Sequence, residues 1–226
     1  MKAQELVRAT KNTKIYLDMD GVLADFFYAY AKLAGIESGK YREIPPAKAD
    51  PTLDKMVGTD FFGTLPKFPT ADALVKLVLK YVSSYNICSS PLRGDFNNSA
   101  YWKKIWIRRH LNPQPSEIEI TGIKEQHAVN ADGSPNILID DKGSNIERWR
   151  AKGGIGIKYQ ADEDSLQKVA DGLAHVYGED YEELEESVDV RYSIYPKLTK
   201  RFVIGEPYGK KNLKVPHAKY VDKTRK

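Results

Sequence analysis

The chain has one cysteine, Cys88, and lacks any apolar stretch of the ~20 residues that a membrane-spanning helix needs. A single cysteine cannot form an internal disulfide, which excludes the disulfide-stapled secreted class. The opening residues, MKAQELVRATKNTK, lack the apolar core of a secretory signal, and myristoylation and prenylation signatures are missing. We therefore expect no membrane association and a cytoplasmic location or an equivalent reducing compartment. The setting of Cys88, SYNICSS, is typical of a buried strand thiol.

Short apolar runs alternate with helical patterns along most of the chain. Strands are predicted at 13–18, 84–88, 117–121, 136–140 and 154–158. Helices are predicted at 26–36, 70–82, 97–111, 143–153 and 164–177. This alternation predicts an α/β fold with a Rossmann-like, mostly parallel sheet and helices on both faces. Short apolar strands suit such a sheet, because both of their faces are covered.

Residues 36–69 interrupt the alternation, since prolines at 45, 46, 51, 66 and 69 break helices and strands. We expect irregular structure there. Its position after the first strand and helix predicts a small inserted cap. The expected organisation is a core over 1–177 that includes this cap, followed by a charged extension over 178–226.

The extension is acidic first and basic afterwards. GEDYEELEESVD (178–189) has seven acidic residues and no basic one, whereas 191–226 has 11 Lys+Arg and 2 Asp+Glu. Two interpretations stay open: the blocks neutralise each other, or the basic end contacts nucleic acid.

Three predicted strands end in polar residues that can perform chemistry: Asp18 with Asp20, Ser89 with Ser90, and Asp140 with Asp141. Ligands of parallel α/β sheets bind beyond the carboxyl ends of the strands, so we expect these side chains to converge. Gly21 follows the first pair and permits a sharp turn.

Carboxylates gathered this closely repel one another unless a cation is present or one of them carries a proton. A hard, oxygen-seeking ion such as Mg²⁺ fits best. The four histidines are scattered at 110, 127, 175 and 217, which argues against zinc. A carboxylate nucleophile beside Mg²⁺ suits phosphoryl transfer, with a second carboxylate as acid and base, a hydroxyl on the phosphate, and a lysine offsetting negative charge.

The motifs DMDGVLADF (18–26), CSSPL (88–92), YWKKIWIRRHL (101–111) and ILIDD (137–141) resemble the four motifs of the haloacid dehalogenase-like superfamily. Within it, the first motif and FFGTLPKFPTADALVKLV (61–78) resemble the 5′(3′)-deoxyribonucleotidases. The resemblance covers about residues 13–160. The stretch after ILIDD also resembles the phosphatase half of phage-type polynucleotide kinase/phosphatases.

The resemblance implies a role for each motif. Asp18 would be the nucleophile and a metal ligand, and Asp20 the general acid/base, touching the metal through its backbone carbonyl. Lys103 would be the motif lysine, with Lys104 as its rival because the helix register is open.

By the same resemblance, Ser89 and Ser90, together with the motif lysine, would bind the phosphate. Asp140 would complete the Mg²⁺ site with support from Asp141. The aromatic side chains expected to face a nucleoside are Phe26, Phe61 and Phe62, for which core packing is the alternative.

Three functions follow. The first is a Mg²⁺-dependent phosphomonoester hydrolase for deoxyribonucleoside or ribonucleoside monophosphates, working through an aspartyl phosphate. The second is a 3′-phosphatase on nucleic-acid ends, held by the basic helix and by the basic end, 191–226. The third is a non-catalytic binding protein on the same fold.

Overall fold

A computed structural model describes residues 7–178 of the 226-residue chain. The charged extension expected after residue 177, including the basic 191–226 segment, lies outside the described residues except for Gly178. Among the residues that are described, no helix has the length and apolar character needed to cross a membrane. The cytoplasmic location stays a prediction.

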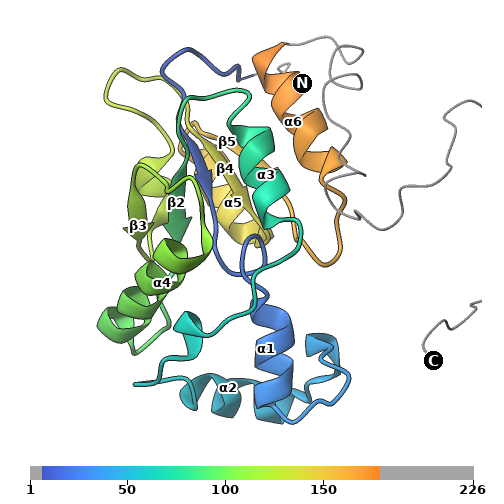
Figure 1. The fold of residues 1–226 in the computed structure, drawn as a ribbon. Helices are drawn as coiled ribbons and strands as arrows, with labels where there is room; N and C mark the ends of the chain where they lie inside the picture. The colour runs from blue at the N-terminus through green and yellow to red at the C-terminus, as the bar shows by residue number, and fades with distance from the viewer. Residues whose placement is uncertain (1–6, 179–226) are drawn as a thin grey trace, which may run out of the picture.

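Five parallel strands form one sheet in the order β3-β2-β1-β4-β5 (Figure 1). The strands are β1 (Ile15–Leu17), β2 (Asn86–Ser89), β3 (Ile118–Ile120), β4 (Ile137–Asp140) and β5 (Ile155–Lys158). The α-helices are α1 (Phe26–Leu33), α2 (Pro46–Asp54), α3 (Ala71–Val78), α4 (Phe96–His110), α5 (Gly143–Ala151) and α6 (Gln167–Tyr177). The predicted α/β class, its five strands and its five helices are thereby confirmed. The first strand lies in the middle of the sheet.

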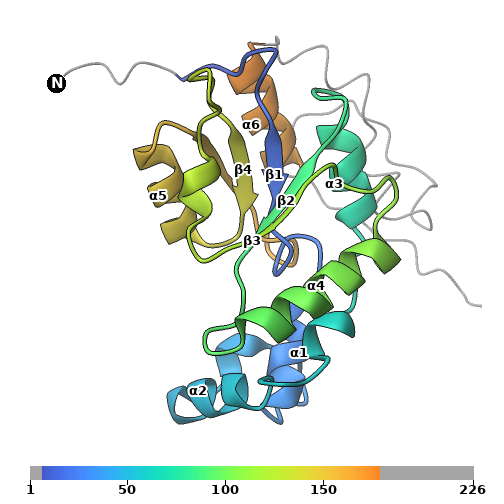
Figure 2. The ribbon, with the colours of Figure 1, turned by 90° about the vertical axis from the view of Figure 1, so that its left-hand side faces the viewer.

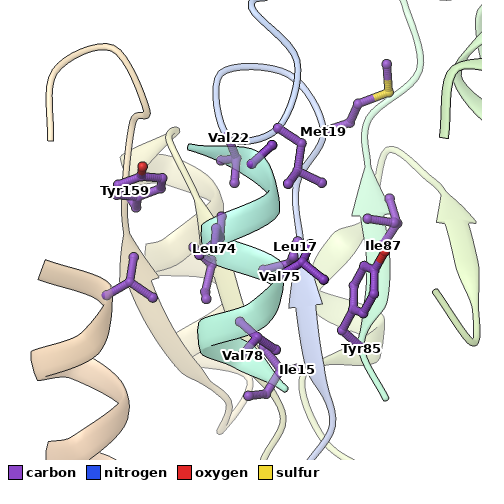
Figure 3. Packing of buried hydrophobic residues seen from close by; sticks show 14 of the residues in the cluster. Ile15, Leu17, Met19, Val22, Leu74, Val75, Val78, Tyr85, Ile87 and Tyr159 are labelled. Atoms are coloured by element: carbon purple, nitrogen blue, oxygen red, sulfur yellow. The ribbon is translucent and has the colours of Figure 1, made fainter. Parts of the chain in front are cut away.

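Alternate residues of the strands cover the two faces of the sheet, as the period of two in a strand requires. In β1, Ile15 and Leu17 join the large core cluster with α3 and α6, whereas Tyr16 packs with Cys88 and with Trp149 of α5. Figure 2 shows α3 and α6 on one side of the sheet and α5 on the other. The packing of α3 against β1 is visible in Figure 3.

The prediction of irregular structure throughout 36–69 was wrong, because α2 forms inside this segment. Two of the prolines in this segment begin the helix rather than break it. Pro45 is the N-cap and Pro46 the first helical residue, where a missing N–H forfeits no helical hydrogen bond. Pro51 lies further inside, at the cost of one such bond.

The remainder of this segment contains two short 3-10 helices, η1 (Tyr41–Glu43) and η2 (Phe61–Gly63). Helices α1 and α2 lie beyond the carboxyl end of the sheet in both views (Figures 1 and 2). This is where the sequence predicts the catalytic side chains. The division into a core and an inserted cap stays a prediction.

Candidate active site

The turn after β1 brings the first carboxylates to the end of the sheet. The Asp18 amide donates to the carbonyl of Ile139, 2.9 Å away, which continues the pairing with β4. Gly21 then adopts φ +78°, and a Cβ there would lie 2.8 Å from Phe27 and 3.0 Å from the carboxyl carbon of Asp141. Only glycine meets both demands, the left-handed backbone and the close approach of Asp141.

Three carboxylates converge at this edge. Oxygens of Asp18, Asp140 and Asp141 all lie within 4.8 Å of one another. Burial raises the pKa of Asp140, and the nearby charge of Asp18 raises it further. The same two causes raise the pKa of Asp141 to about 8. The sequence prediction that β1 and β4 present their acids to one point therefore agrees with the geometry.

Asp20 lies apart from this group, and its carboxylate faces the motif lysine. Lys103, from α4, is fully buried and donates to Asp20 Oδ2 at 2.6 Å. It also donates to the hydroxyl of Ser89 at 3.0 Å and to the carbonyl of Ser90 at 2.7 Å. The helix register is thus decided, because Lys104 is exposed to solvent.

The environment of Asp20 shifts the pKa of its carboxyl group upward. Burial raises the pKa of Asp20, and the charge of Lys103 only partly opposes this effect. Its second oxygen, Oδ1, is buried and has no hydrogen-bond partner among residues 7–178. A buried carboxyl oxygen without a partner is costly unless it meets a ligand or carries a proton.

The sequence interpretation missed a second lysine. Lys124 lies in η3 (Lys124–His127), and its side chain is 1% exposed. Its Nζ lies 2.9 Å from Asp18 Oδ1 and 2.7 Å from Asp140 Oδ2. Burial favours the neutral amine, but the two carboxylates outweigh it, so the pKa of Lys124 is raised.

A signal for this lysine was present in the sequence. Lys124 follows β3 by four residues, and β3 ends at the same edge as the three strands that bear acids or serines. A second missed residue, Asn145 in α5, donates its amide to both oxygens of Asp140, at 3.1 and 3.0 Å. The Lys142 amide donates to Asp140 Oδ1 at 2.8 Å.

The three predicted aromatic side chains lie together. The Phe26 ring stacks on Phe62 with centroids 6.2 Å apart and meets the edge of Phe61 at 6.0 Å. Phe62 is 3% exposed and carries Lys103 Nζ over its ring at 4.7 Å. Phe62 therefore packs in the core and positions the lysine, while Phe26 and Phe61 remain half-buried.

The charge balance of this site fits a divalent cation. Four carboxylates, those of residues 18, 20, 140 and 141, surround two ammonium groups, those of Lys103 and Lys124. The fully ionised site would thus carry two excess negative charges in a poorly hydrated place. Carboxylate oxygens at this spacing are the donors that Mg²⁺ prefers. The Asp20 carboxylate is not part of the three-acid group, so its predicted metal contact would have to use its backbone carbonyl.

Comparisons with known proteins point to one family. No protein-family model matches the chain. The mitochondrial 5′(3′)-deoxyribonucleotidase of Mus musculus is 26% identical over 160 residues, which cover 63% of this chain and 70% of that protein. A Bordetella pertussis protein provisionally named for the same activity is 29% identical over 159 residues, covering 60% and 80%.

Among solved structures, a HAD family enzyme from Bacteroides thetaiotaomicron, in complex with magnesium and inorganic phosphate, aligns with a TM-score of 0.41. It is 17% identical, and the alignment covers 67% of this chain and 96% of that one.

The curated relatives are named as enzymes, which favours a catalytic protein over the binding-protein alternative. The four motifs occupy one end of a five-stranded parallel sheet. Motifs, sheet order and curated relatives together support a haloacid dehalogenase-like phosphatase that resembles the 5′(3′)-deoxyribonucleotidases.

Proposed function

We propose that the chain hydrolyses deoxyribonucleoside and ribonucleoside monophosphates with Mg²⁺, through an aspartyl phosphate on Asp18. The observation that carries the proposal is the convergence of Asp18, Asp140 and Asp141 within 4.8 Å, with Lys124 between the first two. The substrate class rests on the names of the curated relatives.

Asp18 is positioned to attack phosphorus through its Oδ2 atom. Its Oδ1 accepts the Met19 amide at 2.7 Å and pairs with Lys124, which fixes the carboxylate plane. Asp18, Asp140 and Asp141, with the Asp20 carbonyl, would hold Mg²⁺. When bound, the ion neutralises the phosphate oxygens and lowers the repulsion that an anionic nucleophile meets.

Asp20 acts as general acid and then as general base. In the first step the Asp18 carboxylate forms a bond to phosphorus, the ester P–O bond breaks, and the Asp20 proton passes to the leaving alkoxide. In the second step the Asp20 carboxylate takes a proton from water, whose oxygen attacks the same phosphorus. Inorganic phosphate leaves and the Asp18 carboxylate is restored. The raised pKa of Asp20 suits this exchange, because burial favours the protonated acid that the first step requires.

The phosphate itself would lie against the end of β2. The hydroxyl of Ser89 is buried and is fixed by Lys103, so it meets a phosphate oxygen already oriented. Lys103 and Ser90 complete the anion site. One lysine thus serves two purposes: it holds the acid, Asp20, and it offsets charge on the transferring group.

A 3′-phosphatase activity on nucleic-acid ends is the second candidate, favoured by the outer face of α4. Tyr101 is 57% exposed, and Lys104 and Arg108 lie exposed on the same helical face. An aromatic ring beside two cations suits a single strand, through base stacking and phosphate contacts. The basic 191–226 segment could add to this surface.

The test measures phosphate release with Mg²⁺ from a panel of mononucleotides and from a 3′-phosphorylated oligonucleotide. Asp18→Asn should abolish release while the thermal unfolding midpoint stays close to that of the wild type. The exposed Asp54→Asn, on α2, is the matched control and should keep full activity. Normal turnover by Asp18→Asn would remove the proposed nucleophile.

The two substrate classes separate in the same assay. Hydrolysis of the oligonucleotide alone, weakening steeply between 50 and 200 mM salt, would establish the second candidate instead. In that case deletion of 191–226 should reduce activity at low salt. Mononucleotide hydrolysis should be insensitive to this deletion.

A further inference from the structure

Asp140 receives donors from two separate segments of the chain. Asn145 of α5 donates its amide to both carboxyl oxygens, and Lys124 of η3 donates to Oδ2 at 2.7 Å. The two segments pack against each other. The orientation of Asp140 therefore depends on how η3 is fixed relative to α5.

One side chain joins these two segments. Arg148 donates to the side-chain carbonyl of Asn145 at 2.7 Å, and its Nε lies 3.3 Å from Glu125 Oε1. Glu125 directly follows Lys124 in η3. From a single guanidinium group, Arg148 thus contacts one donor, Asn145, and the residue next to the other donor, Lys124.

The contact to Asn145 also decides which end of its amide faces Asp140. With Oδ1 bound to a cation, the NH₂ group is directed at the carboxylate. The reverse orientation would bring a carbonyl oxygen against Asp140 and would lose both hydrogen bonds. The charge on Arg148 polarises the amide and makes its NH₂ a stronger donor.

The Glu125 side chain supports this interpretation. It is 17% exposed, and its Oε2 is buried without a hydrogen-bond partner in the described part of the chain. A carboxylate that is largely buried with one oxygen unpaired needs a cationic partner, and Arg148 supplies one. The pair is therefore more than a solvent-exposed ion pair, although Arg148 itself is 47% exposed.

We propose that Arg148, with Glu125, is a positioning residue for the Mg²⁺ site: it locks Asn145 and Lys124 onto Asp140 without touching substrate. The proposal rests on the proposed function. Groups one layer out from a metal ligand commonly change metal affinity or activity by about 10- to 100-fold when removed. Asn145 and Lys124 lie in that layer, and because Arg148 acts through them, a change at the lower end of this range is expected on its removal.

Arg148→Met tests it in the full-length chain, with Arg150→Met as the matched control. Arg150 lies on the same helix but donates to the carbonyl of Gly156, on β5. Titration with Mg²⁺ alone in a calorimeter should show about 10-fold or greater weakening for Arg148→Met. Turnover should fall by a similar factor with KM little changed. Arg148→Lys should recover part of both losses, and Arg150→Met should match the wild type.

Two outcomes overturn the proposal. One is Mg²⁺ affinity and turnover in Arg148→Met equal to those of Arg150→Met. The other is a loss of Mg²⁺ affinity and turnover in Arg148→Met that is accompanied by a lower unfolding midpoint and that Arg148→Lys does not restore. Failure of the proposed function is distinguishable from failure of this proposal. A wild-type chain that binds Mg²⁺ but hydrolyses no phosphomonoester refutes the proposed function. The Mg²⁺ titration alone then tests the role of Arg148. A wild-type chain that binds no Mg²⁺ refutes both.

Discussion

The contacts of Lys103 predict a large effect on stability. Lys103→Met keeps the length and apolar stem but removes an ammonium that has three partners, at 2.6, 3.0 and 2.7 Å. Both oxygens of Asp20 would then lack a hydrogen-bond partner among residues 7–178. Breaking a buried ion pair from one side costs about 3–5 kcal/mol. The Asp20 side chain is 23% exposed, which permits some hydration and reduces the expected loss to about 2–4 kcal/mol.

The assay is urea unfolding in EDTA, where no metal can compensate for the lost ammonium. Lys104→Met is the control: Lys104 is the next residue on α4 and is exposed, so its loss should stay within about 0.5 kcal/mol. The loss in Lys103→Met should shrink as the pH falls, because protonation of Asp20 removes the unpaired charge. Adding Asp20→Asn should relieve it for the same reason.

Equal stabilities of Lys103→Met and Lys104→Met would refute the reasoning. So would a loss in Lys103→Met that neither acid pH nor Asp20→Asn relieves, because it would then come from packing rather than from an unpaired carboxylate.

Two further predictions concern the carboxylate edge. Gly21→Ala should destabilise the protein more than Gly35→Ala. Both glycines have a left-handed φ, +78° and +80°, which costs about 1–2 kcal/mol for alanine. Only at Gly21 would the new Cβ also meet Phe27 and Asp141. Chemical denaturation measures the difference in unfolding free energy between the two variants. Mg²⁺ affinity should fall only in Gly21→Ala. Equal losses of stability in the two variants would contradict the close approach of Asp141 to Gly21. In EDTA, the unfolding midpoint should fall as pH rises from about 4 to about 8, because folding raises the pKa of Asp141 to about 8 and so favours its protonated form. Asp141→Asn should flatten this dependence and Mg²⁺ should oppose it at pH 8; an unchanged slope in the variant would show that other groups cause it.

The elements of the core could be predicted because their patterns are local. The five strands are short apolar runs bounded by turn residues, and α3 carries its buried residues on one stripe. By contrast, α2 contradicts the rule that prolines break helices. Their effect depends on the position each takes in the helix, and Pro45 and Pro46 lie at its start.

The candidate site likewise contains residues that local sequence predicts and residues that it does not. Asp18 and Asp140 lie at the ends of neighbouring strands, so the rule that ligands bind at the carboxyl ends of parallel strands predicts from the sequence that they meet. The position of Lys124 just after the predicted strand 117–121 places it near this edge, but nothing in its local sequence, GIKEQH, indicates that its side chain is buried rather than exposed to solvent. Its burial between two carboxylates depends on how η3 packs on α5, a contact that local sequence does not encode.

By itself, the sequence determined the α/β class, the acidic ends of two strands and the glycine that permits their turn, because each follows from residue type and from spacing along one segment. Only the tertiary structure decided that Lys103 rather than Lys104 enters the site, since a difference of one residue rotates a side chain by about 100° around the helix. The tertiary structure also placed Lys124, Asn145 and Arg148 around Asp140. Interactions between charges depend on distance in space, and that distance is set by the packing of segments far apart in the chain.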